Sequence, residues 1–185
     1  MENLAVRWIA VSVFVAFATV ALAADGNLVL IKSTLIATFK QENVPVDASF
    51  KKFGGTIIYD AEKPAASSAM ITVDLSSFDI GDAAYNAEVR KPAWFDSAHF
   101  PQGTFCSTAI KPGAAGHFEA TGTLSIKGKT QVLSVPITVQ RIGNADAFDG
   151  SFDLSRKIFG IGDPLWDDVL DDKVHVRFHL LSAKS

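Results

Sequence analysis

Residues 90–106, which read RKPAWFDSAHFPQGTFC, contain side chains whose types could carry out chemistry. A nucleophile, a base and an orienting acid all occur within this stretch: Asp96, Ser97, His99 and Cys106. Such residues could serve acyl transfer, in which a histidine activates a hydroxyl or a thiol. Catalytic triads, however, are assembled from distant segments, and the sequence has no G-x-S-x-G nucleophile elbow. We therefore predict no catalytic residue and no enzyme; a hydrolase that uses residues 94–106 is the alternative.

Three other patterns suggest binding chemistry, and each has a simpler structural explanation. Residues 122–130, GTLSIKGKT, have five residues between the glycines where a phosphate-binding loop has four, so we predict a hairpin turn. His175 and His179 share one face of a predicted strand but lie about 13 Å apart, too far to bind one ion. An acidic group lacks the spacing of a calcium loop and is predicted to form a solvated rim: Asp163, Asp167, Asp168, Asp171 and Asp172. We predict no metal site.

The first residues indicate where the protein works. An apolar run from Trp8 to Leu22 ends in Ala21-Leu22-Ala23, which is typical of a signal peptide cleaved after Ala23. A retained membrane anchor is the alternative, but the run is shorter than the roughly 20 residues that cross a bilayer. We predict a signal peptide over residues 1–23 and a mature protein exported to the periplasm.

Composition narrows the classes of partner. The chain has a net charge of −3 at pH 7 and no basic cluster, which argues against nucleic acid as a partner. Residues 24–185 are long enough for one domain with a sizeable core, and we predict a single domain there. The one cysteine, Cys106, cannot form an internal disulfide, and we predict that its side chain is buried as a small apolar group.

The dominant hydrophobic period along residues 24–185 is two, which indicates half-buried strands. Eight strands are predicted, over residues 28–41, 44–60, 69–75, 103–110, 117–126, 131–140, 147–156 and 173–180. The apolar register of the second strand jumps at Lys51-Lys52, where we predict a bulge. Eight such strands with one apolar face can close as an antiparallel barrel.

Two segments break the strand pattern and are predicted to lie at the barrel ends. In the first, Asp82 can cap a short helix that runs to about Arg90 and is stopped by Pro92. In the second, Asp163 and Pro164 form an N-cap and first-turn pair for one or two helical turns. The predicted fold class is therefore all-β, an eight-stranded antiparallel barrel with one or two short helices at its ends.

The inward registers mix large and small side chains. Phenylalanines alternate along the strands with small residues, for example Phe148 and Phe152 with Gly150 between them. This mixture suits either an interlocking core or an apolar tunnel, and the alternation does not separate the two. Arg156 continues the same inward register, so its guanidinium either reaches water at the rim or donates to the polar end of a bound molecule.

Four motifs occur in a characteristic order: QENVPVDASFKKFGGTIIYD, WFDSAHFPQGTFCST, GTLSIKGKTQ and SRKIFGIG. Together they resemble the YceI-like family of exported polyisoprenoid-binding proteins, over essentially all of the mature chain. The resemblance implies a lipocalin-like barrel without known catalysis. It also implies a long apolar pocket for isoprenoid tails, including quinone-like and prenyl-phosphate lipids.

On this basis we predict a lipid-binding protein that sequesters or carries a long isoprenoid lipid, polyprenyl or quinone-like, with no other cofactor. The predicted ligand-binding residues are Phe39, Phe50, Phe53, Ile57, Trp94, Phe95, Phe105, Phe118, Leu124, Phe152, Arg156, Phe159, Trp166 and Phe178. The aromatic residues around Trp94 either form a flap that touches the ligand or plug the core. An outer-membrane barrel is a further alternative, although its apolar residues would face lipid. The mature chain is predicted to have no integral membrane span and to contact membranes transiently. The sequence is compatible with either a monomer or a homodimer.

Overall fold

The computed structural model describes residues 28–183. The predicted signal peptide, residues 1–23, lies outside the described residues. The elements, with η for 3-10 helices, are η1 (Leu30–Lys32), β1 (Thr34–Gln41), β2 (Val44–Phe50), β3 (Phe53–Ile58), η2 (Pro64–Ala66), β4 (Ser68–Asp74), η3 (Leu75–Ser77), β5 (Phe78–Asp79), α1 (Ala83–Glu88), β6 (Gln102–Pro112), β7 (His117–Ile126), β8 (Lys129–Ile142), β9 (Ala145–Ser155), η4 (Pro164–Trp166) and β10 (Leu170–Ala183).

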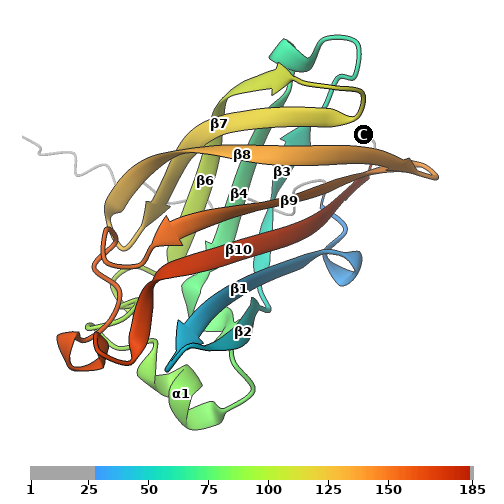
Figure 1. Cartoon of the computed structure of the whole chain (residues 1–185). Helices are drawn as coiled ribbons and strands as arrows, with labels where there is room; N and C mark the ends of the chain where they lie inside the picture. Colours follow the sequence, from blue (N-terminus) through green and yellow to red (C-terminus); the bar gives the residue numbers. More distant parts are fainter. Residues whose placement is uncertain (1–27, 184–185) are drawn as a thin grey trace, which may run out of the picture.

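All ten strands of the described residues belong to one antiparallel sheet, in the order β3-β4-β6-β7-β8-β9-β10-β1-β2-β5. The sheet curls round a central space (Figure 1), which confirms the predicted all-β, lipocalin-like architecture. β3 and β5 are the edges of the sheet, so the hydrogen-bonded ladders of residues 28–183 form a half-barrel with one open seam. Within the same residues, no helix is long and apolar enough to cross a membrane.

The strand count exceeds the predicted eight by two, because the second predicted strand is divided at Lys51 and Lys52 and because the short β5 was not predicted. The predicted bulge is a complete break there, and it divides the second predicted strand into β2 and β3. The reason lies in the backbone partners: Lys51 N donates to Ser77 O at 3.1 Å, and Lys52 N donates to Ser77 Oγ at 3.0 Å. Because η3 supplies these acceptors, the chain leaves the ladder and continues at the other edge of the sheet.

Both predicted helix starts are confirmed. The Asp82 carboxylate accepts hydrogen bonds from Ala84 N and Tyr85 N at the start of α1, which ends at Glu88 rather than at Arg90. Asp163 caps η4, which has Pro164 at its first position. α1 and the loop between β9 and β10 lie at the same end of the sheet, the lower end in Figure 1. We call this the loop end.

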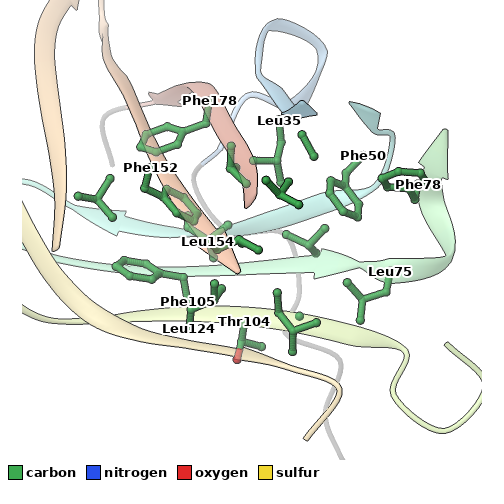
Figure 2. Close-up of a pocket in the computed structure, with 18 of the residues that line it drawn as sticks. Leu35, Phe50, Leu75, Phe78, Thr104, Phe105, Leu124, Phe152, Leu154 and Phe178 are labelled. Atoms are coloured by element: carbon green, nitrogen blue, oxygen red, sulfur yellow. The ribbon is translucent and has the colours of Figure 1, made fainter. Parts of the chain in front are cut away.

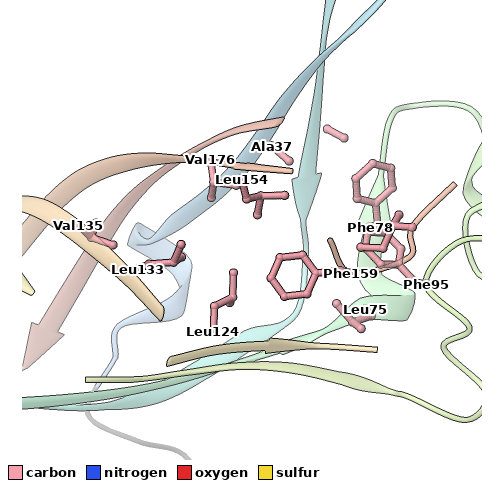
Figure 3. Packing of buried hydrophobic residues seen from close by; sticks show 12 residues of the cluster. Ala37, Leu75, Phe78, Phe95, Leu124, Leu133, Val135, Leu154, Phe159 and Val176 are labelled. Atoms are coloured by element: carbon pink, nitrogen blue, oxygen red, sulfur yellow. The ribbon is translucent and has the colours of Figure 1, made fainter. Parts of the chain in front are cut away.

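The core lies on the concave side of the sheet. The larger cluster of buried side chains includes the fully buried Leu75 and Phe159 and extends to Val135 of β8 and Val176 of β10 (Figure 3). A second, smaller cluster contains Leu28, Ile57, Phe148 and Leu180.

The prediction that Cys106 is buried is wrong. The Cys106 side chain is exposed, and it lies opposite Met70 of β4 and Thr123 of β7. Successive side chains of a strand point to opposite faces, and the neighbouring Phe105 occupies the inner face of β6. The inward register of Phe105 therefore places Cys106 on the outer face, whatever the residue type prefers.

Candidate ligand-binding cavity

An apolar cavity of about 270 Å³ lies inside the curled sheet. Side chains from most of the strands form its wall (Figure 2), and α1, Trp94 and Trp166 contribute to its lining at the loop end. Glu88 and Arg156 are the only charged residues in the lining that the described part of the chain provides. Apolar surface of this kind favours the binding of hydrocarbon, because transfer of hydrocarbon out of water is favourable.

Glycines shape the wall at two places where phenylalanine rings lie across them. A Cβ on Gly122 would come within 2.5 Å of Phe105 Cζ, and a Cβ on Gly150 would come within 2.5 Å of Phe178 Cζ. The rings therefore rest on bare backbone of the neighbouring strand instead of filling the centre. Both sequence-based interpretations hold in part, because the wall interlocks and a cavity remains inside it.

Most of the predicted ligand-binding residues line this cavity, namely Phe39, Phe50, Ile57, Trp94, Phe95, Phe105, Phe118, Leu124, Phe152, Arg156, Trp166 and Phe178. Phe159 does not line it, because it is wholly buried in the larger cluster. Phe53 packs against the second cluster, beside the seam. Whether the lining residues bind a ligand remains a prediction.

Several lining residues were missed by the sequence analysis. Leu35 shares the register of Phe39 on β1, and Tyr59 follows Ile57 in the same register, so alternation could have found both. Phe78 lies on the two-residue strand β5, where no periodicity can be read. Leu75 lies on the 3-10 helix η3, where the strand period of two does not apply.

The aromatic residues of the opening stretch separate into different environments. Trp94 lines the cavity and makes an edge contact with Trp166, with ring centroids 6.3 Å apart. Phe95 forms a cluster of three rings with Phe50 and Phe78, at centroid distances of 6.1 Å and 5.5 Å, and the Phe50 and Phe78 rings are 5.4 Å apart. Phe100 instead packs beside the hairpin glycine Gly128, outside the lining, where it is 36% exposed. The stretch is therefore part cavity lining and part outer support.

The polar residues of that stretch have local partners. His99 Nδ1 lies 2.8 Å from Asp96 Oδ1, and its side chain is 75% exposed. Ser97 Oγ donates to Arg90 O at 3.5 Å, and Cys106 points to the outer face of the sheet. Serine, histidine and cysteine thus have separate surroundings instead of one shared constellation. Within residues 28–183, no three His, Cys, Asp or Glu side chains are grouped as metal ligands would be.

Arg156 is buried at the loop end, with only 4% of its surface exposed. The interpretation that its guanidinium reaches water at the rim is therefore wrong. The guanidinium donates to four protein acceptors: Nε to Asp171 O at 3.0 Å, Nη1 to Ile161 O at 3.0 Å, Nη2 to Leu170 O at 2.9 Å and Nη2 to Asp167 Oδ1 at 2.7 Å. Hydrogen bonds from Lys157 and Arg156 lower the pKa of Asp167. Arg156 thus organises the loop between β9 and β10.

The acidic group of this loop is more than the predicted solvated rim. Asp163 caps η4, and Asp167 pairs with Arg156. Asp172 accepts hydrogen bonds from Ser155 Oγ and from Lys157 N, at 2.8 Å and 2.9 Å. Hydrogen bonds to these three carboxylates stabilise the loop. The spacing of acidic residues along the chain does not predict these hydrogen bonds.

Lys127 connects the two segments that close the loop end. As predicted, residues 127 and 128 form the turn of the β7–β8 hairpin, and both have positive φ angles. The Lys127 ammonium donates to Pro92 O at 2.6 Å and to Gly160 O at 2.8 Å. Burial lowers the pKa of this lysine. The sequence analysis missed this role, because a lysine in a turn is ordinarily solvated.

A curled antiparallel sheet around an apolar cavity is the architecture of lipocalin-like binding proteins. The family model described as YceI-like domain matches residues 29–181, and the chain belongs to this family. BcnA of Burkholderia cenocepacia is 40% identical, with a TM-score of 0.82, over 84% of this chain and 99% of BcnA.

More distant relatives share the fold. A polyisoprenoid binding domain from Saccharophagus degradans is 19% identical with a TM-score of 0.70, over 85% of this chain and 97% of that domain. Protein YceI of Escherichia coli O157:H7 is 30% identical over 118 residues, which are 64% of this chain and 51% of the relative. The matched region thus spans about half the length of the curated relatives.

Proposed function

We propose that this protein binds a long isoprenoid lipid, polyprenyl or quinone-like, in the apolar cavity and sequesters or carries it. The observation that carries the proposal is the cavity itself, whose lining is mostly apolar. Burial of hydrocarbon stabilises a complex by about 0.8 kcal/mol per CH₂ group, so a long tail needs few polar contacts. Membership of the YceI-like family is consistent with this role.

The direction of the side chains supports a cavity ligand over a lipid-facing wall. Phe152 and Phe178 face the interior, whereas Asp153, His175 and Arg177 face outward on the same strands. A transmembrane barrel has the reverse arrangement. The Saccharophagus degradans domain with the same fold is described as binding polyisoprenoid, a ligand that would suit this cavity.

We propose binding without a chemical step and without a further cofactor. The support is local: His99 is paired with Asp96 on the surface, and the Ser97 hydroxyl donates to a backbone carbonyl. Neither group lines the cavity in which a lipid would lie. A nucleophile in this stretch would therefore act away from the bound molecule.

We further propose that the protein works in the periplasm and loads its lipid during transient membrane contact. The predicted signal peptide supports export. Leu165, at the loop end, is 88% exposed and adjoins Trp166, which lines the cavity. An exposed apolar side chain beside a lining residue offers a contact point for a bilayer.

The proposal is tested by purifying the full chain, exported and without detergent, and extracting it with organic solvent for mass spectrometry. We expect an isoprenoid lipid in near-stoichiometric amount. An unrelated periplasmic protein purified in parallel measures lipid background. Protein that contains no lipid and also fails to bind added quinone or polyprenol would contradict the proposal.

A further inference from the structure

The two sulfur-bearing side chains of residues 28–183 lie opposite each other in the sheet. Apart from Met1, the chain contains one methionine, Met70, and one cysteine, Cys106. Met70 of β4 pairs directly with Cys106 of the neighbouring strand β6 in the antiparallel register (Figure 1). Directly opposite residues of an antiparallel pair share one face of the sheet. Both sulfur atoms are therefore on the outer face, next to each other.

Packing does not account for this pair. The Met70 side chain is 48% exposed, and the Cys106 side chain is also exposed. Methionine and free cysteine are among the residues that proteins most often bury. Within the described part of the chain, neither residue belongs to a hydrophobic cluster or to the cavity lining. Two residue types that are usually buried thus lie side by side in contact with solvent.

The two sulfur atoms can reach one metal ion. The Cβ atoms of directly opposite residues are about 4.5 to 5.5 Å apart. Cys106 Sγ is one bond from its Cβ, and Met70 Sδ is two bonds from its Cβ on a flexible, unbranched side chain. An ion held between two sulfur atoms at roughly 2.3 Å each needs them about 4.6 Å apart or less, which this arrangement allows.

The surroundings favour a soft metal ion. The nearest outer-face residues on β4 and β7 carry hydroxyl groups, namely Thr72, Thr121, Thr123 and Ser125. No group of three His, Cys, Asp or Glu side chains that suits a metal occurs among residues 28–183. Thiolate and thioether ligands select Cu(I), whereas imidazole and carboxylate ligands suit harder ions. Two sulfur ligands among hydroxyl groups therefore fit a soft monovalent ion.

We propose that Met70 and Cys106 form a binding site for Cu(I) on the outer face of the sheet, separate from the lipid cavity. On binding, the Cys106 thiol releases its proton to solvent, and the thiolate and the Met70 thioether each donate an electron pair to the ion. The ion keeps its oxidation state, so no oxidant or reductant is needed. The expectation of no metal site concerned histidine and carboxylate ligands, not sulfur.

Silver(I), a soft monovalent ion that does not change oxidation state in the assay, is the first probe. Calorimetric titration of the full-length protein with silver nitrate in chloride-free buffer should show one ion per chain. Met70→Leu keeps an apolar side chain and should weaken binding by about tenfold or more, because one of the two soft ligands is lost. Thr123→Ala is the matched control on the other side of Cys106 and should leave the affinity unchanged. Equal silver affinity of Met70→Leu and wild type would show a lone thiol and overturn the proposal.

Cu(I) itself is the second probe, delivered from its complex with a chelator. X-ray absorption of the loaded wild-type protein should show two sulfur neighbours and no nitrogen neighbour, and this result does not depend on any variant. A single sulfur neighbour completed by nitrogen or oxygen atoms would overturn the proposal. Cys106→Ser should take no Cu(I) from the chelator. Retention of the ion by that variant would place the metal elsewhere and would also overturn the proposal.

Discussion

The wall of the cavity and the loop end are stabilised in different ways. In the wall, pairs such as Phe105 with Gly122 and Phe178 with Gly150 make many similar apolar contacts between neighbouring strands. At the loop end, Arg156 connects four acceptors that are 5 to 15 residues distant in sequence. A wall of additive contacts tolerates single changes, whereas a polar network that shares one donor does not.

The comparison also separates the shape of the cavity from the order of the loop. The shape of the wall depends on ring and glycine packing, since its lining is mostly apolar. The loop end depends on the buried guanidinium of Arg156 and its acceptors in the protein. Changes in the two regions should accordingly alter different measurements.

The largest effect is expected from Arg156→Met. The change leaves three carbonyls and Asp167 without their donor in a buried site, and we expect a loss of about 3 to 5 kcal/mol in the free energy of unfolding. Arg177→Met is the matched control, because Arg177 pairs with Asp47 while 44% exposed, and such pairs contribute under about 1 kcal/mol. Urea denaturation measures both, and equal losses would show that the loop end does not depend on Arg156.

A smaller loss is expected from Gly150→Ala in the wall. The new methyl group would lie 2.5 Å from Phe178 Cζ and 2.7 Å from Pro136 O, so the ring must move into the cavity. We expect a destabilisation of about 1 to 3 kcal/mol together with weaker lipid binding. Gly54→Ala is the control, since a Cβ at Gly54 meets no atom within 4 Å. If lipid affinity survives while stability falls, the cavity is not shaped by this glycine.

Trp94→Ala should weaken binding of a prenyl quinone by about 1 to 3 kcal/mol, because the variant loses apolar contact with the lipid at the loop end. Ser97→Ala and His99→Ala should leave the affinity nearly unchanged, since both side chains lie outside the cavity lining. Calorimetric titration measures all three variants. Turnover of an ester or a phosphate that disappears in His99→Ala would show that the protein is an enzyme.

Acid should reduce stability slightly through the outer face of the sheet. Hydrogen bonds from Lys173 and His175 lower the pKa of Asp153 below the ordinary 3.8. A carboxylate with a lowered folded pKa contributes stability above its unfolded pKa, and this is lost as pH falls through the folded value, so the loss should occur below about pH 4. Asp153→Asn should flatten the pH dependence by under about 1 kcal/mol, because solvent screens the pair. An unchanged profile by thermal melts would exclude this pair as a contributor.

The smallest effect is expected from Cys106→Ser. Because the thiol is exposed on β6, the free energy of unfolding should change by less than about 0.5 kcal/mol. The folded protein should also react readily with a thiol reagent. A slow reaction together with a large destabilisation would show that the Cys106 side chain is buried.

Most strands, and the side chains that face inward on each of them, could be predicted from the sequence. Both depend on the period of two in the hydrophobic pattern of each strand. Phe39, Leu124 and Phe152 were assigned inward on that basis and line the cavity. The caps at Asp82 and Asp163 were equally local, since a carboxylate reaches the next two or three backbone N–H groups.

Elsewhere the outcome depended on partners remote in sequence. The break at Lys51-Lys52 exists because Ser77 supplies acceptors there, and no pattern within the strand reports that. From the sequence, Lys127 is expected to be a solvated turn residue. Only folding brings the carbonyl oxygens of Pro92 and Gly160 to its ammonium.

The sequence by itself therefore determined most of the strands, their inward registers and the two helix caps, because these depend on neighbours a few residues apart. Only the tertiary structure decided that the Phe178 ring rests on Gly150 and leaves a cavity, and that Arg156 is held by Asp167 instead of reaching water. The physical reason is that side-chain volume and hydrogen-bond satisfaction are properties of groups brought together by folding. A guanidinium takes the acceptors nearest to it in space, and the order of residues along the chain does not specify them.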